Sequence, residues 1–412
     1  MQGDKVIWAV VFALSTISIL VVYSSIGTMA YKKSSSPEML LLKHTMHVLI
    51  GLAAMWFAHK VDYRYYSKLS RFALWISVPL LVYTFAFGVS INSAVRWIQI
   101  PVVGTFQPSD FASLALIVNI ASMLSKRQQN IDDIKESLIP ILFWCGIICG
   151  LIALSNLSTA VLLLVTCMLI LFIGRVPVKY LAMLVFVGAL FGALGLTYGD
   201  RLETAKSRMN NFINGTELPF QAKHALIAIA TGGFTGKGPG NSDQRNILPL
   251  PYADFIYAII IEEYGMIGGI TVLALYLLLL HRGMKAAYNS ERAFGGLLSA
   301  GLSFDLVCQA MVNMGVVVGL GPITGQPLPL ISMGGTSMVF TGLSLGIILS
   351  VSRGERDHAW EQTPAKEKEE GAAEVKAPRK EREREKDGDV EGNNTPRKQR
   401  EPRGNVVAPK AA

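Results

Sequence analysis

Ten apolar runs, most of them long enough to cross a lipid bilayer, constrain this 412-residue chain more than any other feature. A transmembrane helix needs about 20 predominantly apolar residues, and a helix satisfies its own backbone polar groups where no water can. The runs are Val6–Gly27, Thr45–His59, Phe72–Val89, Phe111–Leu124, Leu138–Leu154, Leu157–Ile173, Leu181–Tyr198, Phe255–Leu280, Phe294–Gly319 and Met333–Val351. The sequence therefore predicts an all-α polytopic membrane protein of about ten transmembrane helices, with a large extracytoplasmic loop between helices 7 and 8.

Charged residues are concentrated at the C-terminal end of the chain. The whole chain is 17% charged, below the roughly 25% typical of soluble proteins. Of its 38 Lys/Arg and 30 Asp/Glu residues, 15 and 14 lie in residues 353–412. A mixed-charge segment with almost no aromatic residues cannot bury a core. We expect a transmembrane domain over residues 1–352 and a charged, disordered cytoplasmic tail over residues 353–412.

Basic residues in the short connections predict the orientation in the membrane, because cytoplasmic loops carry an excess of Lys and Arg. With the N-terminus inside, the inner loops hold most of these cations, and the short outer loops hold only Lys32, Lys33, Lys43 and Arg96. We expect a multi-pass protein of the cytoplasmic (inner) membrane with both termini in the cytoplasm. Anionic membrane lipid is a partner that basic residues can bind, and nothing in the sequence predicts a nucleic-acid partner.

One acidic residue on the predicted outer side, Asp254, differs from the others. Most outer acids lie in polar loops, whereas Asp254 follows two prolines, Pro249 and Pro251, and directly precedes the apolar run that begins at Phe255. A partly desolvated carboxylate has a raised pKa, which suits a general base. At a helix N-terminus the same carboxylate could simply act as a cap or dipole partner, and the residues alone leave both roles open.

The glycine-rich run 232–242 lies just before this aspartate. It does not have the spacing of a nucleotide-binding phosphate loop, because Thr231 stands where the first glycine should be. Two interpretations stay open: a turn that brings backbone N–H groups, Lys237 and Arg245 toward an anionic headgroup, or a plain flexible loop.

Three acids, Glu262, Glu263 and Asp305, fall within predicted spans. A charged side chain at the bilayer centre costs about 2.5–3.5 kcal/mol on insertion scales. We therefore expect each of them to face a cavity or a partner. Such acids also occur in proton-coupled transporters, which keeps a transport function open.

Six motifs in order along the chain resemble the SEDS family (shape, elongation, division and sporulation), which includes the FtsW-type and RodA-type proteins. They are Asn92-Ser93-Ala94-Val95-Arg96-Trp97-Ile98, Gln107-Pro108-Ser109-Asp110, Gly236–Ser242 with Gln244-Arg245, Leu248-Pro249 through Tyr257, Glu262-Glu263-Tyr264-Gly265, and Pro322–Gly335. The resemblance covers about residues 5–352 and excludes the tail.

The resemblance implies a peptidoglycan glycosyltransferase that polymerises lipid II, the undecaprenyl-pyrophosphate-linked disaccharide-pentapeptide, on the outer face of the membrane. It implies a class B penicillin-binding protein transpeptidase and other divisome proteins as partners. The family's essential aspartate matches Asp254, which would take the proton from the acceptor sugar's 4-hydroxyl. We expect a role in septal synthesis during cell division. Three alternatives stay open: an elongation-type RodA-like polymerase, a lipid II flippase or transporter, and a non-catalytic divisome scaffold.

The pyrophosphate leaving group needs cations or a metal ion. We expect substrate binding by Arg96, Lys237, Arg245 and Arg208, with Asp110 and Ser332 from the matched motifs, and a divalent cation (Mg²⁺ or Mn²⁺) as the one candidate cofactor, with no metal ligands identified. The chain also departs from the family, because Leu250, Tyr252 and Ala253 replace its Glu, His and Thr, and Ser113 stands in place of a lysine.

Overall fold

The computed structural model describes residues 2–27, 36–91, 94–100, 104–127, 138–186, 188, 207–208, 212–214 and 218–362. Residues 1–357 form one compact unit and residues 358–412 a second. Within the described residues, seven helices are long and apolar enough to cross a membrane. They are α1 (Lys5–Ser25), α3 (Pro37–Lys60), α4 (Tyr63–Phe87), α5 (Pro108–Lys126), α11 (Ile256–Tyr288), α12 (Ala293–Val317) and α13 (Ser337–Gln362).

Two shorter apolar helices, α6 (Ile139–Ser155) and α7 (Leu157–Ile173), complete the match to nine of the ten predicted runs. The minimal break at Ser155-Asn156 does separate two helices. Asn156 is the N-cap of α7, and its side chain accepts a hydrogen bond from the Thr159 backbone N–H. The remaining run, Leu181–Tyr198, lies largely outside the described residues, and so do residues 363–412 of the tail predicted over residues 353–412. Residues 353–362 of that predicted tail are helical, because α13 continues to Gln362.

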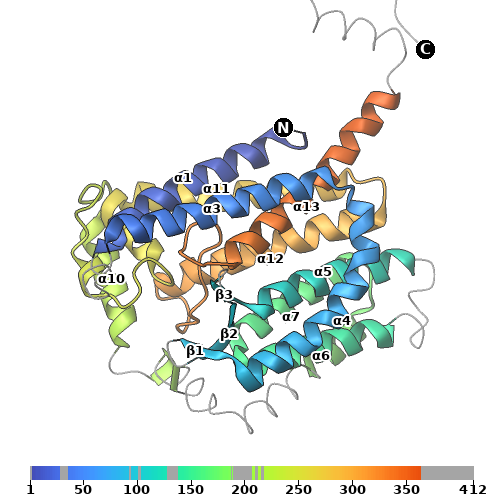
Figure 1. Cartoon of the computed structure of the whole chain (residues 1–412), viewed down its shortest axis with the longest axis horizontal. Helices are drawn as coiled ribbons and strands as arrows, with labels where there is room; N and C mark the ends of the chain where they lie inside the picture. The colour runs from blue at the N-terminus through green and yellow to red at the C-terminus, as the bar shows by residue number, and fades with distance from the viewer. Residues whose placement is uncertain are drawn as a thin grey trace, which may run out of the picture. The chain divides into compact units, whose positions relative to one another are not determined.

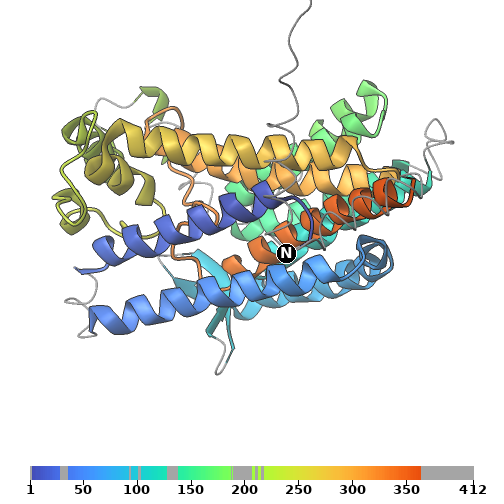
Figure 2. The ribbon, with the colours of Figure 1, turned by 90° about the horizontal axis from the view of Figure 1, so that it is seen from above.

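Helix α12 lies between two groups of helices, with α1 and α11 on one side and α4 to α7 on the other (Figure 1). Helices α11 and α12 run side by side (Figure 2). A Cβ on Gly283 of α11 would lie 1.9 Å from the Ser303 Oγ of α12, and a Cβ on Gly301 would lie 2.6 Å from Ile170 of α7. Small residues therefore permit the close approach of backbones that drives helix association in a bilayer.

A small antiparallel sheet between α4 and α5 departs from the all-α expectation. Its strands are β1 (Val89–Ile91), β2 (Ala94–Ile100) and β3 (Gly104–Phe106), in the order β1-β2-β3. The sequence signal was weak because these strands are short and follow an apolar run without a break. The sheet matters for the site because β2 carries Arg96.

The glycine-rich run 232–242 packs against a break in α11. It follows helix α10 (Phe220–Gly232) and precedes the short 3-10 helix η3 (Gln244–Asn246). Gly265 has φ 71° inside α11, and a Cβ there would lie 2.1 Å from the Phe234 carbonyl oxygen. The backbone N–H groups of Lys237 and Gly238 donate to the carbonyls of Glu262 and Glu263 (2.9 and 3.0 Å).

These bonds assign a structural role to two of the run's backbone N–H groups. The loop supplies donors to carbonyls that the helix break leaves without intrahelical partners. The N–H groups of Lys237 and Gly238 are used for this purpose, so they are not directed to an anionic headgroup. The run is a packed structural loop.

Candidate active site

Asp254 lies in the turn before α11, in a segment that the loop between α12 and α13 holds in place. Ser332 donates to the Ala253 carbonyl (2.6 Å) and accepts from the Leu328 N–H (2.8 Å). The Met333 N–H donates to the Tyr252 carbonyl (2.9 Å). The backbone around the aspartate is therefore fixed by residues that lie about 80 positions later in the chain.

Asn313 of α12 completes this support. Its side-chain amide donates both to the Asp254 carbonyl (2.9 Å) and to the Gln326 carbonyl (2.7 Å). One buried side chain thus joins the aspartate segment to the α12–α13 loop. Each of the two joined segments contains a non-glycine residue with a positive φ: Leu250 (58°) in the segment before Asp254 and Leu330 (64°) in the α12–α13 loop. Such backbone conformations cost roughly 1–3 kcal/mol and cluster at functional sites.

The Asp254 side chain is partly buried, but its oxygens accept no hydrogen bond from the part of the chain that the structure describes. Burial raises its pKa above the usual aspartate range, and the positive charges of Arg96 and Arg208 partly oppose this rise. Gly325 (φ 67°) lies beside it, since a Cβ there would be 3.6 Å from Asp254 Oδ2. The carboxylate is thus held in position while its oxygens remain available to a substrate.

Arg96 and Arg208 reach the surroundings of Asp254 from separate parts of the chain. The Arg96 Nε of β2 donates to the Ser155 carbonyl between α6 and α7 (3.4 Å). The Arg208 Nη1 donates to the Ile323 carbonyl in the α12–α13 loop (2.9 Å). Both arginines were predicted as substrate ligands, and both place a guanidinium where its charge acts on Asp254.

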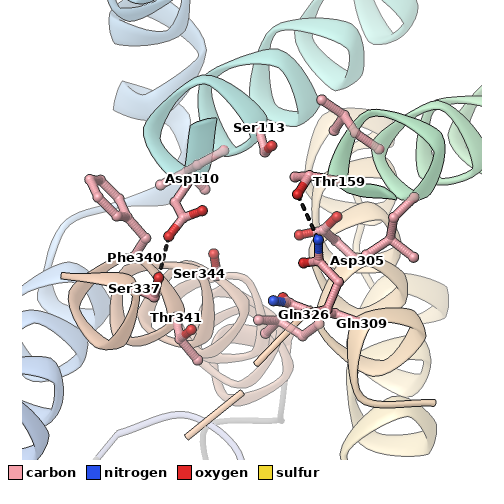
Figure 3. Close-up of a pocket in the computed structure, with 14 residues that line it drawn as sticks. Asp110, Ser113, Thr159, Asp305, Gln309, Gln326, Ser337, Phe340, Thr341 and Ser344 are labelled. Carbon is pink, nitrogen blue, oxygen red and sulfur yellow. Dashed lines mark hydrogen bonds between the residues drawn. The ribbon is translucent and has the colours of Figure 1, made fainter. Parts of the chain in front are cut away.

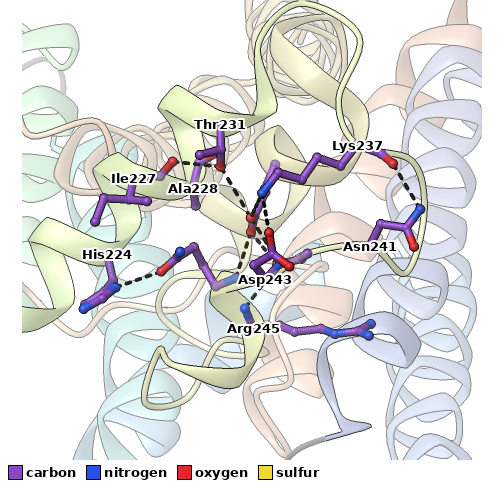
Figure 4. A network of polar contacts seen from close by, with 11 residues as sticks. His224, Ile227, Ala228, Thr231, Lys237, Asn241, Asp243 and Arg245 are labelled. Atoms are coloured by element: carbon purple, nitrogen blue, oxygen red, sulfur yellow. Dashed lines mark hydrogen bonds and ion pairs between the residues drawn. The ribbon is translucent and has the colours of Figure 1, made fainter.

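Lys237 belongs to a different network, in which it lies beside Asp243 (Figure 4) and donates to Glu262. Its Nζ lies 2.8 Å from both Glu262 Oε1 and Asp243 Oδ2, and these acids raise the pKa of the lysine. Arg245 Nη1 donates to the Ser24 carbonyl of α1 (3.0 Å). Substrate binding by Lys237 and Arg245 stays a prediction, and the structure gives both side chains internal contacts.

Asp110 and Ser332, the other two predicted ligands, also have internal partners. Ser332 is 2% exposed, and its two bonds described above make it a positioning residue. Asp110, at the start of α5, accepts from Gln107 Nε2 (2.9 Å) and from Ser337 Oγ of α13 (2.5 Å).

Asp110 and Asp305 lie on opposite sides of a polar cavity of about 60 Å³ inside the helix bundle (Figure 3). Gln326 also lines this cavity and donates to Thr159 Oγ1 (2.7 Å), next to the segment that holds Asp254. Sequence reasoning missed Asn313 and Gln326. It did predict that Glu262, Glu263 and Asp305 would each face a partner or a cavity. This is confirmed, because Lys237 donates to Glu262, Ser24 donates to Glu263, and Asp305 lines the cavity.

No cluster of three or more His, Cys, Asp or Glu side chains that could hold a metal ion occurs within the described ranges. Mg²⁺ is commonly bound by one or two carboxylates together with substrate phosphates. Asp254, with oxygens that accept no bond in the described structure, has the donor chemistry for that arrangement.

The fold and the site define a polytopic membrane protein with one supported aspartate and two arginines at the end of its helix bundle. Residues 4–357 match the FtsW/RodA/SpoVE family, described as cell cycle proteins. The chain belongs to this family, which confirms the resemblance seen in the motifs.

Curated relatives match over most of their length. Stage V sporulation protein E of Bacillus subtilis (strain 168) is 32% identical over 366 residues, covering 86% of this chain and 98% of the relative. The probable peptidoglycan glycosyltransferase FtsW of Geobacter sp. (strain M18) is 32% identical and covers 85% and 96%.

Solved structures share the fold. A chain of a peptidoglycan synthase complex that coordinates polymerization and crosslinking has a TM-score of 0.68 and 25% identity, covering 86% of this chain and 98% of that one. The rod shape determining protein RodA of Thermus thermophilus has a TM-score of 0.63 and 23% identity, covering 86% and 97%.

Proposed function

We propose that this chain is a peptidoglycan glycosyltransferase that polymerises lipid II into glycan strands for septal synthesis in cell division. The observation that carries the proposal is the Asp254 carboxylate, which is fixed through its backbone, desolvated, and influenced by two arginines. Relatives named as probable peptidoglycan glycosyltransferases FtsW support the reaction and the division role.

In the proposed reaction Asp254 accepts the proton of the acceptor's 4-hydroxyl as that oxygen attacks the donor's anomeric carbon. Negative charge develops on the departing undecaprenyl pyrophosphate. Arg96 and Arg208 would stabilise this charge, since guanidinium groups bind phosphate oxygens in a bidentate fashion. A divalent cation, where one is bound, would be held by Asp254 and the pyrophosphate oxygens and would neutralise part of the same charge.

The protein is a multi-pass membrane protein, and we infer that both termini face the cytoplasm so that Asp254 faces outward. The distribution of basic residues supports this orientation. A class B penicillin-binding protein transpeptidase is the proposed partner, alongside other divisome proteins. The similarity to a chain from a complex that couples polymerization to crosslinking supports a transpeptidase partner.

Lipid II transport is the second candidate function. The observation that favours it is the cavity between Asp110 and Asp305, because buried carboxylates inside a helix bundle occur in proton-coupled transporters. A flippase would move headgroups without forming polymer and would not need Asp254. A non-catalytic scaffold would neither move headgroups nor form polymer.

The test uses the purified full-length chain with labelled lipid II, with and without the transpeptidase. The wild type should form glycan strands, and Asp254→Ala should form none. The matched control is Asp243→Ala, an outer aspartate whose exposed side chain pairs with Lys237, which should polymerise normally because ion pairs of exposed side chains contribute little. Strands from a folded Asp254→Ala protein would remove the aspartate from the mechanism, and translocation without polymer would establish the flippase.

A further inference from the structure

A basic cleft opens between α4, α5 and α6, at the ends of α4 and α5 that lie away from the sheet and from Arg96. It has a volume of about 470 Å³. We define the basic cleft by its four cations and two tryptophans, which are Lys68, Arg71 and Trp75 of α4, Lys126 and Arg127 at the end of α5, and Trp144 of α6. Its described lining includes no carboxylate.

Arg127 already makes an internal contact, whereas the other three cations of the basic cleft are not explained by internal pairing. Lys68, Arg71 and Lys126 form no ion pair with any described residue. The polar groups deeper in the cleft are satisfied by one another, since Ser67 and Ser122 share a hydrogen bond (2.6 Å) and Asn119 donates to Ser70 (3.4 Å). Like charges that converge on one concave space repel each other, so the arrangement favours an anionic occupant.

The two tryptophans place this cleft at the level of lipid headgroups. Trp75 and Trp144 form an edge-to-face pair with ring centroids 5.0 Å apart, and Trp75 is 62% exposed. Tryptophan is enriched where a membrane meets water. Cations grouped beside such a pair, between transmembrane helices, match the chemistry of a phosphate-bearing lipid headgroup.

We propose that the basic cleft binds the headgroup of an anionic phospholipid that carries two phosphate diesters, as cardiolipin does. Arg71 and the lysines would contact the phosphate oxygens, and the tryptophans would pack against the glycerol and the upper acyl chains. This site is separate from Asp254 and does not depend on the proposed polymerase activity.

The test measures how tightly the detergent-purified full chain retains tetraoleoyl cardiolipin in native mass spectrometry, against phosphatidylcholine as reference. K68Q/R71Q/K126Q should bind cardiolipin roughly a hundredfold more weakly, at about one factor of five per cation. The control K179Q/K285Q/R292Q removes three exposed cations that do not line the cleft and should bind like the wild type. K68R/R71K/K126R should retain most of the binding, which separates lost charge from misfolding.

Three results would overturn the proposal. Equal losses in the cleft and control variants would mean general attraction to charge. Displacement of the lipid by inorganic phosphate at matched phosphate concentration would identify a free-phosphate site. Binding that appears only in D132N/D133N/E136Q would show that acids of the neighbouring segment fill the cleft; residues 128–137 lie outside the described structure.

Discussion

Glu262 and Asp254 are both acids of the segment that enters and begins α11, but their carboxylates have opposite surroundings. Glu262 is fully buried and accepts from Lys237 Nζ (2.8 Å), Ser242 Oγ (2.5 Å) and the backbone N–H groups of Asp243 (3.2 Å) and Gln244 (3.3 Å). Asp254 is held through its backbone, and its carboxylate accepts no bond from described residues. A saturated carboxylate stabilises a fold, and one left unsaturated is available for chemistry.

The same contrast separates the cations. Lys237 is occupied by two acids, whereas Arg96 and Arg208 use part of each guanidinium on backbone carbonyls and act on Asp254 through their charge. Of the four cations predicted to bind substrate, Arg96 and Arg208 are the two whose charge acts on Asp254.

The largest expected effect is on the free energy of unfolding, which should differ between variants of the two acids. Glu262→Ala should lower the free energy of unfolding by about 3–5 kcal/mol, because it leaves the Ser242 hydroxyl and the backbone N–H groups of Asp243 and Gln244 without their acceptor and removes the buried partner of Lys237. Asp254→Ala should leave stability unchanged or slightly raised at neutral pH, because it removes a partly buried acid whose raised pKa opposes ionisation in the folded state. Thermal unfolding of both variants in the same detergent checks this.

The matched control for this pair is Glu262→Ala combined with Lys237→Met. Removing both charges should recover part of the lost stability, because the cation that lost its buried partner is removed as well. If Asp254→Ala proved as destabilising as Glu262→Ala, the two carboxylates would share a structural role and the comparison would fail.

A smaller effect concerns pH. Asp254 must be deprotonated to accept a proton, so the rate should fall as pH drops through its pKa, and this acidic limb should lie above the ordinary aspartate value of about 3.9. Arg96 lowers that pKa, so Arg96→Gln should move the limb to higher pH, and Arg208→Gln should act in the same direction. The measurement is kcat/KM for polymerisation over a series of pH values, because this ratio reports the pKa of the free enzyme.

Lys237→Gln is the control for the pH series, since its charge acts on Glu262 and Asp243. The acidic limb of the Lys237→Gln rate profile should coincide with that of the wild type. A limb that stayed fixed in both arginine variants would mean that another group titrates, and that Asp254 is not the base.

Most of the helical fold could be predicted from the sequence, because apolar run length is a local property. The prediction placed nine helices, separated α6 from α7 at Asn156, and selected Asp254 from its two prolines and the run that follows. Asn313 and Gln326 could not be found this way. Their importance arises from contacts between segments distant in the chain, and nothing local distinguishes them from other polar residues of a helix or loop.

The acids within spans illustrate the limit of sequence reasoning. The cost of burying charge required partners for Glu262 and Glu263, and that requirement is met. It could not show that the partner of Glu262 would be Lys237, which was expected to bind substrate. The glycine run gave the same difficulty, because its glycines serve close packing on α11 at Gly265 and had been compared with a ligand loop.

The smallest expected effect concerns an outer acid with no network of this kind. Glu38 is exposed in the first turn of α3, which Ser36 caps, and a carboxylate there contributes about 0.3–1 kcal/mol through the helix dipole. Glu38→Ala should therefore polymerise lipid II at the wild-type rate and unfold at nearly the same temperature. Loss of activity equal to that of Asp254→Ala would break the comparison. It would show that an exposed acid without supporting contacts can be essential, and that backbone support and desolvation do not identify the catalytic carboxylate.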